Sequence, residues 1–161
     1  MQAVDSRGLV LFLCIGIAGL CEGPTPTAAQ SRDDRSYVGS TACRDCHQAE
    51  YENFRQFAKK ARSFDSVSRM RSRLTPEEFR GCLECHTTGY GRPGGFRSES
   101  ETPELSNAGC EVCHGPGSRH VVTADADDID GSLTQQTCET CHNEERIEAF
   151  NFTPMIYGGG H

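Results

Sequence analysis

The chain has 161 residues, a formal net charge of −7 and no tryptophan. Its acidic balance argues against a nucleic-acid-binding protein, because such proteins present clustered Lys and Arg to the phosphate backbone. Aliphatic side chains are too sparse for an ordinary core of this size, so something else must fill the interior.

Residues 1–29 are predicted to be a secretory signal peptide. Arg7 supplies the positive charge, residues 8–20 form an apolar run too short to span a bilayer, and small residues precede a cleavage point after Ala29. Cys21 raises the alternative of a lipid anchor, which the bulky Leu20 before it disfavours. We therefore expect export to the periplasm or the cell exterior.

Residues 30–161 are predicted to form one domain that is mainly α-helical with extensive loops. No second long apolar stretch follows the leader, so no membrane span is expected in the mature chain. Removal of the leader takes away Cys14 and Cys21 and leaves eight of the ten cysteines.

A helix over about 48–67 is predicted to be the longest in the chain. Its apolar residues recur at steps of three and four and draw one stripe. The residues of that stripe are Tyr51, Phe54, Ala58, Ala61, Phe64 and Val67.

Two later helices are predicted from the residues that start them. Thr75 is a typical N-cap, followed by Pro76 at the first helical position and Glu78 at the third, and Thr134 caps a similar run. A further short helix is predicted over 143–150. Loops are predicted over 89–103 and 124–131, the second nearly all acidic and interpreted as solvated, and no strand pattern of useful length occurs.

Four Cys-x-x-Cys-His motifs contain all eight remaining cysteines. Their first cysteines are 39, 28 and 28 residues apart, and the segments between them show no clear repeat. The motifs are Cys43-Arg44-Asp45-Cys46-His47, Cys82-Leu83-Glu84-Cys85-His86, Cys110-Glu111-Val112-Cys113-His114 and Cys138-Glu139-Thr140-Cys141-His142.

This motif is the attachment site of heme c. The two sulfurs add to the two vinyl groups of heme, and the following His becomes the proximal ligand of the iron. Zinc sites and structural disulfides are the alternatives, but zinc does not need a His after every second cysteine, and a disulfide within each motif would constrain little chain. The sequence therefore predicts four covalent hemes, with His47, His86, His114 and His142 as proximal ligands.

The second axial ligands are limited by the histidine count. Four hemes with two His each would need eight histidines, whereas the chain has six. His120, after a compact Gly-Pro-Gly turn, and His161, at the end of a glycine-rich lead, are the candidate distal ligands. At least two hemes must then bind another group or keep an open site.

Other side chains are weaker candidates for those positions. A methionine ligand would raise the potential of its heme, and the alternative is a gap-filling role in the core. Lysine ligates iron only when deprotonated, so a solvated cationic face is favoured for the basic residues after the first motif. These candidates are Met70, Met155, Lys59, Lys60 and Arg62.

Three segments resemble the cytochrome c-554 family of tetraheme carriers. They are YVGS at 37–40, GCLECHTTGY at 81–90 and GCEVCHGPGS at 109–118. The resemblance implies a largely helical fold around closely stacked heme pairs, mostly bis-His ligation and electron carriage in the periplasm, which in nitrifying members follows hydroxylamine oxidation. One departure is that family members commonly carry a distal His after the first motif, where this chain has Lys59-Lys60-Ala61-Arg62-Ser63.

Electron transfer between redox partners is the function that the motifs favour, with an electron carrier preferred over a catalyst. Two alternatives stay open: a small reductase or oxidase of nitrogen oxides or peroxide at an open heme, and a subunit of an extracellular conducting filament. The expected partners are redox proteins, including a quinol-oxidising membrane complex or an extracellular acceptor, and further copies of the chain.

Overall fold

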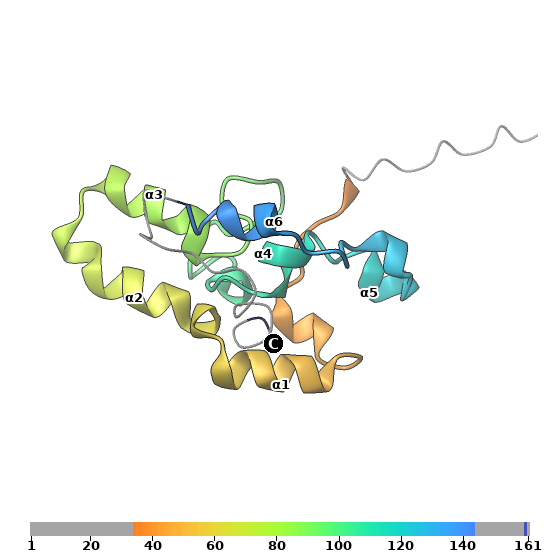
Figure 1. Ribbon diagram of the computed structural model, residues 1–161. Coiled ribbons are helices and arrows are strands. Elements are labelled where there is room, and N and C mark those ends of the chain that lie inside the picture. Colours follow the sequence, from red (N-terminus) through yellow and green to blue (C-terminus); the bar gives the residue numbers. More distant parts are fainter. Residues whose placement is uncertain (1–33, 144–159, 161) are drawn as a thin grey trace, which may run out of the picture. The chain divides into compact units, whose positions relative to one another are not determined.

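The computed structural model describes residues 34–143 and residue 160. In this part of the chain it is helical and contains no strand, as predicted (Figure 1). The α-helices are α1 (Gln48–Phe57), α2 (Ser63–Met70), α3 (Pro76–His86), α4 (Cys110–His114), α5 (His120–Thr123) and α6 (Gln135–Glu139). Single 3₁₀ turns are η2 (Ser40–Cys43), η3 (Lys59–Arg62), η4 (Arg71–Arg73), η5 (Pro103–Leu105) and η6 (Ala126–Asp128).

The chain divides by its internal contacts into Met1–Ser31 and Arg32–His161, and every described residue belongs to the second unit. The predicted signal peptide, its cleavage point and Cys21 lie outside the described residues, as do His161, Met155 and nearly all of the predicted helix 143–150. Those expectations stay predictions.

The single helix predicted over 48–67 is wrong. Ala58 has an extended backbone (φ −79°, ψ 116°) that ends α1, and the chain resumes through η3 into α2. The longest described helix is therefore α3, at 11 residues against 10 for α1.

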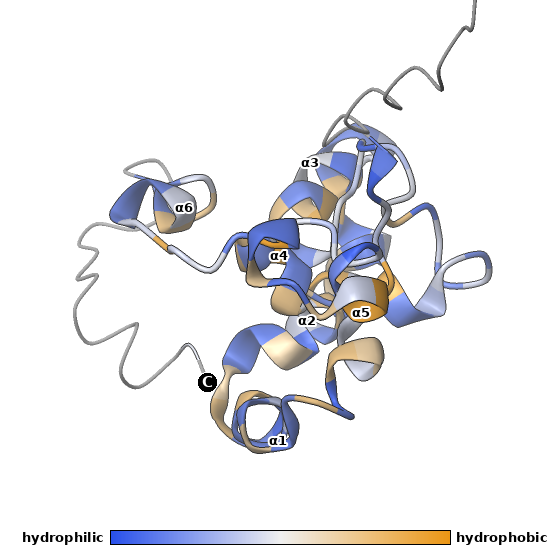
Figure 2. Ribbon diagram, turned by 90° about the vertical axis from the view of Figure 1, so that its right-hand side faces the viewer, coloured by the Kyte–Doolittle hydropathy of each residue, from blue (hydrophilic) through white to orange (hydrophobic). Residues whose placement is uncertain are grey.

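The predicted stripe itself is buried except for Tyr51, which is partly exposed. Ala58 packs with Phe54 and Ala61 in one cluster, whereas Phe64 packs with Leu83 in another. The break at Ala58 lets the two halves of the stripe serve two separate cores, because the second half is not bound to continue in the direction of α1. Figure 2 shows hydrophilic and hydrophobic residues mixed within most of the labelled helices, as one-sided burial requires.

The start of α3 matches its prediction in detail. Thr75 Oγ1 accepts a hydrogen bond from the backbone N–H of Glu78 at 3.2 Å, and Glu78 Oε2 accepts one from the backbone N–H of Thr75 at 2.8 Å. Pro76 occupies the first helical position. This capping box fixes the start of the helix whose last turn carries the second motif.

The start of α6 is also where it was predicted. Thr134 is the N-cap residue, and its backbone N–H donates to Thr137 Oγ1 at 3.3 Å. Because the helix starts one residue after this cap, the fourth motif begins within the helix and ends in the turn that follows it.

The main aliphatic and aromatic core is small. Phe64, Leu83, Phe96 and Leu105 form it, and Tyr37, Phe79 and Tyr90 cover its edges. A glycine is required at position 89, shortly after the second motif, because Gly89 has φ +70° and an added Cβ would lie 2.6 Å from the ring of Tyr37. A core this limited agrees with the sparse aliphatic composition.

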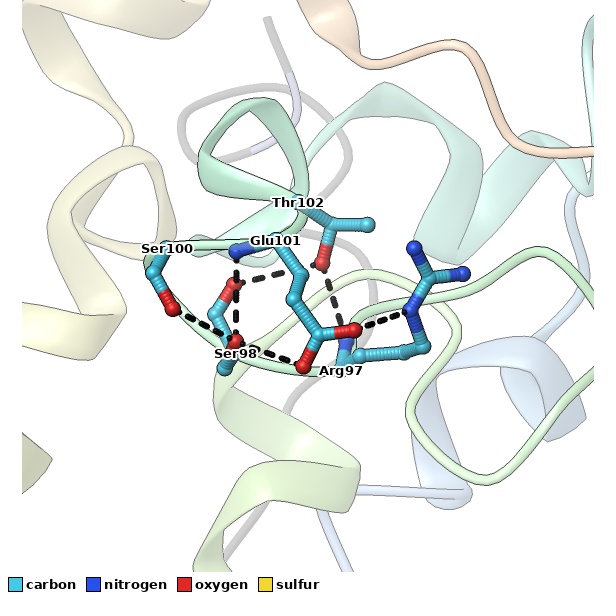
Figure 3. Close-up of polar contacts among 5 residues, drawn as sticks. All are labelled: Arg97, Ser98, Ser100, Glu101 and Thr102. Carbon is cyan, nitrogen blue, oxygen red and sulfur yellow. Dashed lines mark hydrogen bonds and ion pairs between the residues drawn. The ribbon is translucent and has the colours of Figure 1, made fainter.

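The loop predicted over 89–103 is a loop, ordered by its own polar contacts (Figure 3). Arg97 pairs with Glu101 at 2.9 Å, and the backbone N–H of Arg97 donates to Thr102 Oγ1 at 2.9 Å. These bonds lead into η5, where Leu105 is 1% exposed and its carbonyl accepts the N–H of Thr88. The loop thus fixes the segment that packs against the end of the second motif.

The segment before the first motif pairs with the segment around the third. The backbone N–H of Ser36 donates to Ser118 Oγ at 2.9 Å, and the backbone N–H of Ser118 donates to the carbonyl of Ser36 at 3.1 Å. Ser40 Oγ accepts the N–H of Cys110 at 3.0 Å. Residues about 70 positions apart in sequence are thereby held side by side.

Candidate functional site

Each of the four motifs lies at a short helix or helical turn. The second ends α3, and the third forms α4. The first begins in η2 and ends at His47, the N-cap residue of α1, while the fourth begins in α6. A helical turn brings residues three and four apart onto one face, so both cysteines and the His of a motif can face one ligand.

Three of the candidate iron ligands have their second ring nitrogen held by a backbone carbonyl. Nδ1 lies 2.9 Å from Ser63 O in His86, 2.7 Å from Asp130 O in His114 and 2.8 Å from Asp125 O in His120. A carbonyl only accepts, so Nδ1 carries the proton in each ring. In the neutral ring this leaves Nε2 as the nitrogen with a free lone pair, which is the tautomer of a metal-ligating histidine.

The ring of His120 lies beside that of His47 in the first motif. The ring centroids of His47 and His120 are 6.1 Å apart, and their planes are inclined by 27°. An imidazole nitrogen binds a metal ion at about 2.0 Å with its ring centroid about 1.2 Å behind it, so two rings on opposite sides of one ion have centroids about 6.4 Å apart. The spacing fits an axial pair at the heme of the first motif.

The first and third motifs are in direct contact. The thiol of Cys43 donates a hydrogen bond to that of Cys110, which lowers the pKa of Cys110 to about 6 and raises the pKa of Cys43. None of the eight motif cysteines forms a disulfide. Their side chains are therefore available for thioether bonds, and the hemes of these two motifs would be neighbours.

Lys60 is half-buried and lies near the third and fourth motifs. Burial, and then the positive charge of Lys60, lower the pKa of His142. Burial also raises the pKa of Cys113, and Lys60 opposes that rise. The interpretation of a solvated cationic face therefore fits the exposed Lys59 and Arg62 but not Lys60.

The acidic loop 124–131 has a role that the sequence interpretation missed. Asp125 and Asp130 are exposed, but their backbone carbonyls hold His120 and His114. Asp128, with a side chain 14% exposed, pairs with Arg119 at 2.9 Å and accepts from Thr123 at 2.7 Å. The loop thus supports two candidate ligands through hydrogen bonds and is not only a solvated connection.

Ser63 and Glu111 were also missed. Ser63 contacts His86 twice, since its carbonyl faces Nδ1 and its hydroxyl donates to the carbonyl of His86 at 2.7 Å. Glu111 is a 2% exposed carboxylate between the cysteines of the third motif. The sequence shows a Glu at this position but not its burial. The fourth motif has Glu139 at the same position, and that residue is exposed.

The remaining candidates are less defined. Met70 is 52% exposed at the end of α2. Within the described residues, no group of three or more His, Cys, Asp or Glu side chains converges as a metal cluster, and no helix is long and apolar enough to cross a membrane.

A cavity of about 420 Å³ lies beside the second motif. Its lining combines three arginines with apolar side chains: Arg71, Arg80, Arg97, Leu74, Phe79, Leu83 and Tyr90. The guanidinium of Arg71 stacks over the ring of Phe79 at 4.8 Å. The chain thus has a locally cationic surface in spite of its net charge of −7.

A helical fold with four Cys-x-x-Cys-His motifs, histidines in the ligating tautomer and a facing pair of imidazoles defines a c-type cytochrome of the multiheme class. The family Cytochrome c554 and c-prime matches residues 42–115. Cytochrome c-554 of Nitrosomonas europaea is 32% identical over 105 residues, which cover 58% of this chain. The chain is similar to this family over these residues, and heme c is the cofactor that its motifs and this similarity indicate.

The match spans 44% of the length of that curated relative. A solved structure of reduced cytochrome c554 from Nitrosomonas europaea has a TM-score of 0.59 and 23% identity, and the superposition covers 80% of this chain and 86% of that one. The two chains therefore share a fold, which agrees with the class predicted from the sequence.

Proposed function

We propose that the protein is an exported tetraheme electron carrier. The observation that carries this function is the facing pair of His47 and His120, with ring centroids 6.1 Å apart. Two axial histidines would close both sides of the iron at the first motif to small substrates, as befits electron exchange. Heme c supplies the reversible one-electron change of iron that such a carrier needs.

The protein's own residues hold the ligands rigidly. The carbonyls of Ser63, Asp125 and Asp130 fix the ring orientation and the proton of His86, His120 and His114 respectively. Such hydrogen bonds make the opposite nitrogen a better donor to iron and favour the oxidised state. Because these ligands need not move or exchange protons, electron transfer requires little reorganisation.

The closeness of the first and third motifs supports electron exchange within the chain. The thiols of Cys43 and Cys110 share a hydrogen bond, so the groups attached there would lie in contact. We propose these two as one stacked heme pair.

A second candidate function is catalysis at an open heme. It is favoured by the absence of histidine from residues 59–63, where Lys60 instead lies half-buried near His142. His161 remains the candidate distal ligand for another heme. The histidine count leaves at least two irons without a second His, and such a site would accept a nitrogen oxide or peroxide.

The proposed partner is an acidic redox protein. The cavity beside the second motif is lined by Arg71 and Arg80, together with Arg97, which is already paired with Glu101, and the first two would attract carboxylates close to a heme. A quinol-oxidising membrane complex and an extracellular acceptor are the donor and acceptor classes that suit an exported carrier. Self-association into a filament would instead use His161.

Two measurements test the function. The mass of the mature chain should correspond to loss of residues 1–29 and gain of four hemes. Stopped-flow reduction should load all four hemes and discharge them to a soluble acceptor, with ferric spectra showing at least one low-spin bis-His heme. Steady-state turnover with a high-spin signal that responds to nitrite, hydroxylamine or peroxide would favour catalysis instead.

A further inference from the structure

Glu111 is a buried carboxylate with three backbone donors. Gly117 N–H donates to Oε1 at 2.7 Å, Gly39 N–H donates to Oε2 at 2.8 Å, and Val38 N–H is shared between the two oxygens at 3.0 and 3.1 Å. The residue is 2% exposed. Among the described residues, none of the ion pairs within 4.0 Å includes it.

These donors belong to two chain segments, one that precedes His47 and one that precedes His120. Val38 and Gly39 immediately precede η2, which leads into Cys43 and His47. Gly117 precedes His120 by three residues and is itself buried. One carboxylate therefore joins the backbone that delivers the proximal ligand to the backbone that delivers the distal candidate.

The geometry is that of an ionised acid. Both oxygens face N–H groups, so each acts as an acceptor and neither is placed to donate. Hydrogen bonds from N–H groups to a carboxylate are stronger than those between neutral groups. A buried negative charge with no cation within 4.0 Å in the described part of the chain also favours the more positive state of a nearby iron, which is the ferric state.

We propose that Glu111 is a positioning residue for the axial pair His47 and His120, and that its fixed charge lowers the midpoint potential of the heme they bind. This inference rests on the proposed heme function. The hydrogen bonds of Glu111 are all with backbone N–H groups, so it would act on the heme through its charge and through the segments that it joins.

The fourth motif supplies a matched control. Glu139 follows the first cysteine of its motif, as Glu111 does, but it is exposed. Its carboxylate accepts a hydrogen bond from the side chain of Gln135 within the same helix, and over residues 34–143 no hydrogen bond joins it to a distant segment. E139Q therefore removes the same charge from the same motif position without breaking hydrogen bonds between distant segments.

The experiment compares E111Q, E111D and E139Q as mature holoproteins. E111Q keeps the shape and removes the charge, so the midpoint potential of one heme should shift to a more positive value. E111D keeps the charge but shortens the reach, so one low-spin ferric signal should convert in part to high-spin and return on addition of imidazole. E139Q should leave both the redox titration and the spin state as in the wild type.

The inference is overturned if E111Q and E139Q give the same titration curve and E111D keeps the wild-type spectrum. It is also overturned if both Glu111 variants lose all four hemes, because a local positioning residue should leave the other motifs loaded. If E111Q does not mature, E111D decides the question by the same spectra. A wild-type protein without covalent heme would instead refute the proposed function itself.

Discussion

The third and fourth motifs share the pattern Cys-Glu-x-Cys-His, but the fold treats them differently. Around the third motif, Glu111 is buried, Ser40 caps the N–H of Cys110, and Asp130 holds His114. In the fourth motif, Glu139 and the neighbouring Thr140 are exposed. Identical attachment chemistry is thus placed in two environments.

The difference shows that the same attachment motif can lie in a buried or an exposed environment. The third motif is built into contacts with residues 36–40, which lie about 70 positions earlier. The described contacts of α6 are mostly with residues of its own helix, such as Thr134 with Thr137 and Gln135 with Glu139. We therefore expect substitutions at the third motif to affect other hemes and those at the fourth to stay local.

The largest expected effect comes from removing either attachment site. C110A/C113A and C138A/C141A should each lose one of four hemes, measured by mass. The third-motif variant should also unfold at a lower temperature, because Cys110 lies against Cys43 and the paired segments there. The melting temperatures are measured by circular dichroism. Equal values for the two variants would contradict the expected difference between the third and fourth motifs.

The next effect concerns His120, which follows the third motif in sequence and is the proposed distal ligand of the heme at the first motif. H120A should convert one low-spin heme to high-spin, because the ring opposite His47 is lost. V122A is the control, since Val122 is on the same short helix but 84% exposed and should leave the ferric magnetic resonance spectrum unchanged. An unaltered H120A spectrum would exclude His120 as a ligand.

A smaller effect is expected in the acidic loop that supports the third motif. D128N removes the charge that pairs with Arg119 at 2.9 Å, and should cost about 1 kcal/mol of unfolding free energy. The matched substitution E101Q breaks the exposed pair with Arg97 at the same distance and should cost less. Chemical denaturation of both variants checks the order, and a reversed order would show that the loop is not a support.

The smallest effect is a pH dependence at the helix starts. Hydrogen bonds from Thr75 lower the pKa of Glu78 below its usual value of 4.5, so the stability it contributes is present above that pH and is lost as pH falls through the lowered value. The cap of α6 uses Thr134 and Thr137 and does not titrate. Melting temperatures of wild type and E78Q should differ at pH 6 and converge near pH 3; a constant difference would contradict this.

Some features could be predicted because their causes are local. The capping box of Thr75 and Glu78 involves four consecutive residues, and the loop 89–103 follows from its glycines and prolines. The break at Ala58 could not be predicted from periodicity, because the same apolar spacing suits one helix or two shorter ones. The choice was made by two clusters that need Phe54 and Phe64 in different places.

By itself, the sequence determined the covalent chemistry: four motifs, their proximal histidines and a histidine count too low for two per heme. These depend on residue identity and on spacings of two or three positions. Only the tertiary structure brought the ring of His120 to that of His47, placed Cys43 against Cys110, and buried Glu111 while leaving Glu139 exposed. The reason is that burial and ligand pairing depend on contacts between segments far apart in the chain, which short-range patterns do not encode.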